Sequence, residues 1–151
     1  MFKKILVPID GSECAGKALD YALVLAEKFC ASIEILHVVP PIPLRLLPYV
    51  GEAMTTPPLW MGTYVKETKT MSEKMLSEAL EKSLIAKPDL TISTKLVEGR
   101  EGDQIVKRAK DGSFDLIVIG SRGLGGIREF FLGSVSDWVA DNAECPVMIV
   151  K

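Results

Sequence analysis

Short apolar runs that alternate with helical patterns limit the fold of this chain more than any other feature of its sequence. The runs are nearly continuous in apolar character, which is typical of parallel strands that are covered on both faces. They stand at residues 5–9, 33–39, 116–119 and 147–150. A further run at 91–97 alternates in polarity and is rich in β-branched residues, which fits an edge strand. The sequence therefore predicts a sheet of five strands.

The segments between these runs carry the periodicity of amphipathic helices. Ser12 is the expected N-cap of the first, with Glu13 in its first turn. The others are expected at 68–87, 102–110 and 134–142. Strands that alternate with helices predict right-handed crossovers and a parallel, doubly wound sheet. In such a sheet ligands bind beyond the carboxyl ends of the strands, where the strand order reverses.

One stretch does not fit this regular order. Residues 40–64 contain six of the nine prolines together with many apolar side chains. A loop of this length inside a compact domain is uncommon, and its apolar content argues against a solvated linker. Two interpretations stay open, because the segment could pack over its own domain or form part of a subunit interface. At 151 residues we expect one domain over 1–151, with 40–64 as a proline-rich insertion.

Charge and composition exclude several classes of function. The net charge of −2 gives no broad basic field for nucleic acid. A single histidine and three separated cysteines argue against a zinc site and against a Ser-His-Asp triad. We expect buried or half-buried thiols at Cys14, Cys30 and Cys145, as in a reducing compartment. Since no apolar run reaches the length of a membrane span or a signal-peptide core, we expect a soluble cytoplasmic protein.

The strongest chemical signal follows the fourth strand. Four glycines fall within seven positions, at 120, 123, 125 and 126, and Gly133-Ser134 opens the last helix. Glycines leave backbone N–H groups bare, and a helix N-terminus favours an anion, so the two parts together indicate a split phosphate clamp. The alternatives are a flexible turn and a simple N-cap at Ser134. Arg122 and Arg128 could contact phosphate or lie on the surface.

Two further residues near the strand ends have more than one interpretation. Asp10 ends the first strand, where a carboxylate can accept hydrogen bonds from ribose hydroxyls or hold a cation through phosphates. Its alternative role is to cap the first helix, which Ser12 already serves. His37 fits a partly buried strand histidine better than a catalytic base.

On these residues the chain resembles the universal stress protein family, in its nucleotide-binding branch. The signature of that branch is G-x2-G-x9-G-[ST], and Gly120, Gly123, Gly133 and Ser134 satisfy each spacing. The likeness extends over the whole chain, through the starting KILVPIDGS, the LHV strand end, the VEG before the third helix and the closing CPVMIV. It implies a three-layer α/β fold of the Rossmann-like, adenine nucleotide alpha hydrolase-like type, with strand order 3-2-1-4-5.

The resemblance also implies an ATP site, which ADP or AMP could also fill, with Mg²⁺ held through the phosphates and no protein metal ligands. Val38 would meet the adenine through its backbone, beside Pro8 and Ile9. Asp10 and Gly120 would hold the ribose. The phosphates would lie against two segments, Gly120, Ser121, Arg122, Gly123, Leu124, Gly125 and Gly126 in the first and Gly133, Ser134, Val135 and Ser136 in the second. It further implies a homodimer paired through Val147–Val150.

Related nucleotide-binding classes lack their motifs here. The chain has no GxxxxGK[ST] of a P-loop, and Asp-Gly-Ser stands where a dinucleotide-binding domain has GxGxxG. No residue is an obvious base for attack by water, so we expect no catalytic residues and at most weak ATP hydrolysis. Three hypotheses remain: an ATP-binding stress-response regulator, a slow metal-dependent ATP hydrolase, and a nucleotide-free interaction module that uses residues 40–64.

Overall fold

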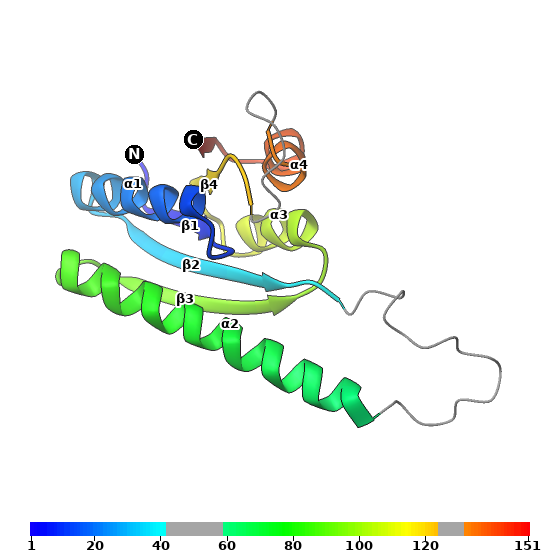
Figure 1. Ribbon diagram of the computed structural model, residues 1–151. Helices are drawn as coiled ribbons and strands as arrows, with labels where there is room; N and C mark the ends of the chain where they lie inside the picture. The colour runs from blue at the N-terminus through cyan, green and yellow to red at the C-terminus, as the bar shows by residue number, and fades with distance from the viewer. Residues whose placement is uncertain (42–58, 124–131) are drawn as a thin grey trace.

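The computed structural model describes residues 1–41, 59–123 and 132–151 of the chain. Nine elements alternate along these residues (Figure 1): β1 (Lys4–Pro8), α1 (Glu13–Phe29), β2 (Ser32–Val39), α2 (Leu59–Ala86), β3 (Ile92–Glu98), α3 (Glu101–Asp111), β4 (Leu116–Gly120), α4 (Ser134–Asn142) and β5 (Val147–Val150). The strands form one parallel sheet in the order β3-β2-β1-β4-β5. The expected doubly wound α/β fold is confirmed, and so is the edge position of the third strand.

Side chains of alternate residues in the central strands belong to two hydrophobic cores, one on each face of the sheet. On one face Ile5 and Val7 pack with buried residues of α1 and with Leu76 of α2. On the other face Leu6 packs with Ile105 of α3 and with Val139 of α4. Each central strand is thus covered on both sides, which explains its nearly continuous apolar character. Helices α1 and α2 cover one face of the sheet, and α3 and α4 cover the other (Figure 1).

The first helix begins as its sequence predicts. The Ser12 hydroxyl accepts a hydrogen bond from the Ala15 N–H at 3.2 Å, which caps α1. The helix ends at Cys30 in the left-handed region, with φ of 54°. Cys30 is exposed, so its predicted burial is wrong, whereas Cys14 and Cys145 are half-buried.

Helix α2 is longer than expected. It begins at Leu59, so residues 59–64 are helical and the predicted irregular segment 40–64 is wrong at that end. Residues 42–58 of that segment lie outside the described part of the chain. Trp60, Tyr64 and Val65 stand at helical spacing and are more than a third exposed. None of the described helices is both long enough and apolar enough to cross a membrane.

An ion pair ties α3 to the sheet. Arg108 Nε and Nη2 donate to the two carboxylate oxygens of Glu34 on β2, each at 2.6 Å. The Glu34 side chain is only 12% exposed. These bonds raise the pKa of Arg108 above its usual value. Both groups have lost much of their contact with water. Removing either one should therefore destabilise the fold, because the other charge would be left without its partner.

Replacing Glu34 with alanine should lower the free energy of unfolding by about 2 kcal/mol, because it removes two charge-assisted hydrogen bonds and leaves Arg108 without its partner. The exposed pair Lys17–Glu13 on α1 is the matched control. Glu13→Ala should change the same free energy by less than about 0.5 kcal/mol. Urea unfolding measures both, and equal losses for the two variants would contradict the importance given to the Glu34 pair.

Candidate functional site

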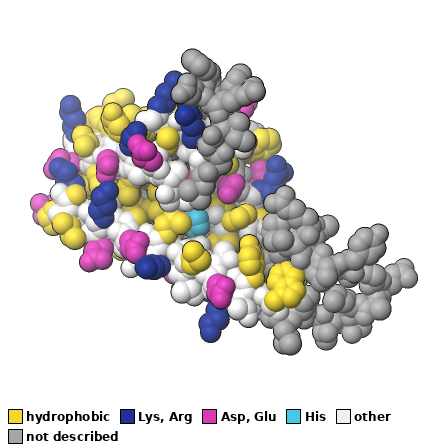
Figure 2. Space-filling view, in the orientation of Figure 1, with side chains coloured by type: hydrophobic (Ala, Val, Ile, Leu, Met, Phe, Trp, Pro, Cys, Tyr) yellow, Lys and Arg dark blue, Asp and Glu magenta, His cyan; other side chains and the backbone are white. Residues whose placement is uncertain are grey.

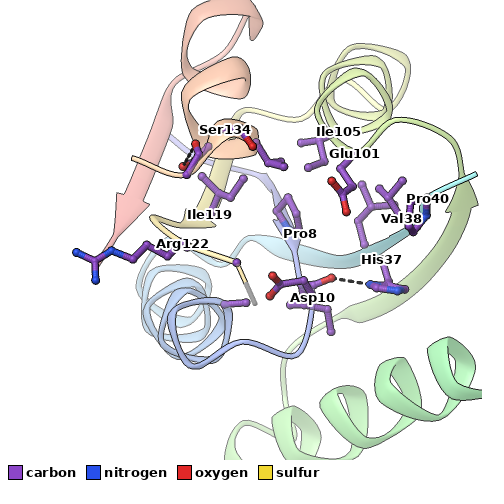
Figure 3. A pocket seen from close by; sticks show the side chains of 18 of the residues that line it. Pro8, Asp10, His37, Val38, Pro40, Glu101, Ile105, Ile119, Arg122 and Ser134 are labelled. Atoms are coloured by element: carbon purple, nitrogen blue, oxygen red, sulfur yellow. Dashed lines mark hydrogen bonds between the residues drawn. The ribbon is translucent and has the colours of Figure 1, made fainter. Parts of the chain in front are cut away.

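A cavity of 640 Å³ opens at the carboxyl ends of β1, β2 and β4, with the first turns of α3 and α4 on its rim (Figure 3). This volume is in the usual range for sites that bind small molecules. The sheet order places β1 between β2 and β4, so the cavity lies at the point where the strand order reverses. Figure 2 shows the hollowed face, with the single histidine in cyan among hydrophobic side chains.

Pro8 helps to open the cavity between β1 and β4. The Ile9 N–H donates to the Leu36 carbonyl of β2 at 2.8 Å. Because successive residues of a strand direct their backbone groups to opposite neighbours, the nitrogen of Pro8 faces β4. Proline has no N–H to donate. Accordingly, β1 pairs with β4 at Ile5 and Leu6, whereas its pairing with β2 continues to Pro8.

Asp10 is held near the middle of the cavity by the loop that follows β1. Its Oδ1 accepts a hydrogen bond from the Ser12 N–H at 2.9 Å. The intervening Gly11 has φ of +83°, a conformation that favours glycine. A β-carbon built on Gly123 would lie 2.7 Å from Oδ2 of Asp10. The Asp10 carboxylate after β1 and Gly123 after β4 therefore lie next to each other.

Ser12 fastens these two loops together. While its hydroxyl oxygen accepts from the Ala15 N–H, its O–H donates to the Arg122 carbonyl at 3.2 Å. One side chain thus caps α1 and fixes the backbone just before Gly123. The loop after β1 and the loop after β4 are held as one unit on the same side of the cavity.

Gly120 brings β4 against the start of α1. A β-carbon at this position would lie 2.8 Å from the Ala15 nitrogen and 2.8 Å from the Cys14 carbonyl carbon. Both atoms belong to the backbone, so neither can move aside without moving the helix. Glycine at 120 is therefore required by packing, whatever else it does in the cavity.

The first turn of α4 forms the other wall. Gly133 is its N-cap, so the alternative of Ser134 as N-cap is wrong. The Gly133 N–H donates to the Ser121 carbonyl at 2.7 Å, which anchors the turn to the end of β4. The first bond inside the helix runs from the Asp137 N–H to the Gly133 carbonyl. The N–H groups of residues 134–136 precede that bond, as at any helix start, and are available to an anion.

The two serines of this turn differ in their surroundings. Ser134 is exposed at the cavity rim, whereas Ser136 is buried with 2% of its surface exposed. The Ser136 hydroxyl lies within donor distance of the Gly133 carbonyl, at 2.9 Å, and of the Ser121 carbonyl, at 3.2 Å. It therefore serves the backbone of the turn, which leaves its N–H as the group that can face a ligand.

The opposite end of the cavity is mostly apolar. Val38, Pro40 and Ile105 line it, with Glu101 at the rim (Figure 3). His37 borders the same end, and its Nδ1 lies 2.7 Å from the Ile9 carbonyl. Since a carbonyl only accepts, Nδ1 carries the proton in this contact. His37 is a half-buried strand residue that ties β2 to β1, in agreement with its predicted structural role.

Within the described part of the chain, no group of three or more His, Cys, Asp or Glu residues is arranged to hold a metal ion.

A sequence model of the universal stress protein family matches residues 1–151. The chain belongs to the universal stress protein family. The fold and the family expected from the sequence are both confirmed.

Curated relatives support the same assignment for this universal stress protein, and solved structures support its fold. Universal stress protein YxiE of Bacillus subtilis is 37% identical over 151 residues, covering 100% of both chains. Universal stress protein MJ0531 of Methanocaldococcus jannaschii is 32% identical, covering 100% of this chain and 83% of the relative. The structure of UspA from Lactobacillus plantarum has a TM-score of 0.79 at 22% identity and covers 99% and 98% of the two chains. A universal stress protein solved in complex with cAMP has a TM-score of 0.70 at 26% identity, covering 99% and 97%.

The structure of this universal stress protein brings most of the predicted site residues to the cavity. Those that line it are Pro8, Ile9, Asp10, Val38, Gly120, Arg122, Gly123, Gly133, Ser134, Val135 and Ser136. Figure 3 shows the Arg122 side chain directed away from Asp10. Ser121 is buried beside the cavity, where its carbonyl anchors α4. The predicted positions Leu124, Gly125 and Gly126 lie outside the described residues.

Several lining residues were not predicted as site residues. They are Ala15, Leu36, His37, Pro40, Glu101, Ile105, Ile119 and Leu132. Most of them lie within predicted strands and helices, near the ends that face the cavity. The parallel topology was therefore the signal that could have found them. Glu101 begins α3, whose predicted start at Gly102 misses it by one position.

Proposed function

We propose that this universal stress protein binds an adenine nucleotide, ATP above all, in the cavity between β1 and β4, and acts as a nucleotide-dependent regulatory protein. One observation carries the proposal. Along the cavity, an apolar end is followed by the Asp10 carboxylate and then by the first turn of α4. Base, sugar and phosphates of a nucleotide need these three environments in this order.

The base would lie at the apolar end. Val38 lies next to the last residue of β2 there, and its backbone can meet the edge of the adenine, as the family resemblance implies. Pro8, Ile105 and Pro40 supply apolar surface around it. A flat aromatic ring gains most from such surfaces because its faces are poorly hydrated.

The ribose would lie against Asp10. One carboxylate oxygen is already fixed by the Ser12 N–H, so the side chain is oriented before a ligand arrives. Its other oxygen, Oδ2, faces Gly123 and remains able to accept a hydrogen bond from a hydroxyl. Gly120 brings the backbone of β4 to the same place.

The phosphates would lie between Gly123, with the loop through Gly126, and the first turn of α4. The N–H groups at 134–136 and the positive end of the helix dipole face that position. Ser134 adds an exposed hydroxyl, and Ser136 contributes through its backbone. Mg²⁺ held through the phosphates would neutralise part of their charge.

Other properties of the molecule support the wider proposal. The solved relative with cAMP is similar over almost its whole length, at 26% identity. The thiols at Cys14, Cys30 and Cys145 are unpaired, which fits a reducing compartment such as the cytoplasm. A single universal stress protein domain over 1–151 is part of the proposal, and the family match over the same residues supports it.

A homodimer through β5 completes the proposal. β5 lies at the edge of the sheet, and its Val147, Met148 and Ile149 are only half-buried. An edge strand presents backbone N–H and C=O groups to which a second copy can add. Light scattering that gives the mass of one chain at micromolar concentration would remove this part of the proposal.

ATP with Mg²⁺ at 100 times its dissociation constant should stabilise the folded protein by about 2.7 kcal/mol. For a chain of 151 residues this corresponds to an increase in Tm of roughly 5–10 °C. Differential scanning fluorimetry with ATP, ADP and AMP measures it. If none of the three shifts Tm, with or without Mg²⁺, the chain is a nucleotide-free module and the proposal fails.

A further inference from the structure

Glu101 places a negative charge at the base end of the cavity. It lies in the first turn of α3, and Figure 3 shows its side chain directed into the cavity near Val38 and Ile105. The residue is exposed at the rim, so a ligand in the cavity could reach the carboxylate. At this end the other lining side chains are apolar, apart from His37, whose Nδ1 already donates to the Ile9 carbonyl.

The start of α3 is held in place by contacts on both sides. Before it, the Gly99 N–H donates to the Val39 carbonyl at 3.0 Å, and Gly99 has φ of +142°. Within its first turn, a β-carbon on Gly102 would lie 2.4 Å from Trp138 of α4. The guanidinium carbon of Arg100 lies 5.8 Å from the centroid of the same Trp138 ring. These contacts fix the backbone from which Glu101 projects.

The two helices that begin at the cavity differ in the charge that they bring into it. The first turn of α3 contains Glu101 and Asp103 and that of α4 contains Asp137, but of these three residues only Glu101 lines the cavity. Any helix N-terminus attracts an anion, but a carboxylate in the first turn opposes that attraction. Because the carboxylate that lines the cavity belongs to α3, a phosphate chain is favoured at α4, and the α3 end is left for the base.

We propose that Glu101 is a specificity-determining residue that accepts a hydrogen bond from the exocyclic 6-amino group of adenine and repels phosphate from the base end. The inference rests on the proposed nucleotide site and adds its selectivity. A carboxylate offers only acceptors, so it suits an amino group. Hypoxanthine has an oxygen at the same position, so a carboxylate placed to accept from the 6-amino group would face a second acceptor, and the N1–H of hypoxanthine could replace the contact only if the base moved.

The test compares ATP with ITP, which differ at this edge of the base, for wild type, Glu101→Gln and Asp103→Asn. Isothermal titration calorimetry with Mg²⁺ gives Kd for each pair. Wild type should bind ATP at least roughly tenfold more tightly than ITP, as expected for a hydrogen bond to a charged group. In Glu101→Gln the ratio should fall to about threefold or less, because an amide can accept from an amino group and donate to an oxygen.

Asp103→Asn is the matched control, since it removes the same charge from the same turn at a residue that does not line the cavity. It should keep the wild-type ratio. If Glu101→Gln also keeps that ratio, the inference is overturned and any selectivity belongs to the backbone of β2. A preference for ITP in wild type overturns it as well. If wild type binds neither nucleotide, the proposed function itself fails, and the inference fails with it.

Discussion

Replacing Gly123 with valine should abolish the stabilisation of the folded protein by ATP while the fold stays intact. The added β-carbon would lie 2.7 Å from Oδ2 of Asp10, and the two methyl groups would extend further into the cavity. The atom that it meets is the end of a side chain, and Gly123 is exposed, so the chain can avoid the clash by moving the carboxylate. That movement breaks the hydrogen bond from the Ser12 N–H and displaces the group proposed to hold the ribose.

Scanning fluorimetry with and without ATP measures the effect. In Gly123→Val the Tm without ligand should stay close to that of wild type, and the increase of roughly 5–10 °C expected with ATP should be lost. Gly16→Ala is the control, because a β-carbon at Gly16 of α1 meets nothing within 4 Å. That variant should keep the full response to ATP. An undiminished response in Gly123→Val would mean that this loop does not contact the nucleotide.

Replacing Gly120 with alanine should destabilise the protein itself, by about 3 kcal/mol. The new methyl group would lie 2.8 Å from backbone atoms of Cys14 and Ala15. Unlike the carboxylate beside Gly123, these atoms belong to α1, which is fixed by its cap and by the core beneath it. Overpacking of this kind costs about 1–3 kcal/mol where side chains can adjust, and more where they cannot.

Urea unfolding without nucleotide isolates this effect from ligand binding. Here too Gly16→Ala is the comparison, and it should raise the free energy of unfolding by about 0.5–1 kcal/mol because alanine favours the helix. Gly120→Ala and Gly16→Ala thus make the same chemical change, but we expect it to lower the free energy of unfolding at Gly120 and to raise it at Gly16. A Gly120→Ala variant as stable as wild type would show that β4 and α1 are packed more loosely than described.

The strands were predictable because burial on both faces requires apolar residues at nearly every position of a strand. Leu6 and Val7 belong to different cores, and both positions must be apolar. The cap at Ser12 was predictable as well, since it depends on local chemistry alone. By contrast, the predicted start of α2 at residue 68 lies too late in the chain, since the helix begins at Leu59. Residues 59–67 do have helical apolar spacing, but prolines and apolar residues just before them hide where that pattern begins.

The glycine positions of the candidate site could be predicted from their spacing, but the reasons for them could not. Spacing treats Gly120 and Gly123 alike as phosphate-loop residues. The structure separates them, because one makes room for the backbone of α1 and the other makes room for Asp10. The topology places the start of α3 at the cavity end of the sheet, but it does not predict that the Glu101 side chain lines the cavity. Its relation to the cavity depends on how α3 packs against Trp138, which is a contact between distant parts of the chain.

A titration of ¹⁵N-labelled protein with ATP and Mg²⁺, followed through the backbone amide signals, tests the central claim most directly. The account predicts the largest shifts at both ends of the cavity, at Gly123, at residues 133–136 and near Val38, with the carboxyl-terminal half of α2 unchanged. Shifts confined to α2, or no shifts at saturating ATP, would contradict a nucleotide site between β1 and β4.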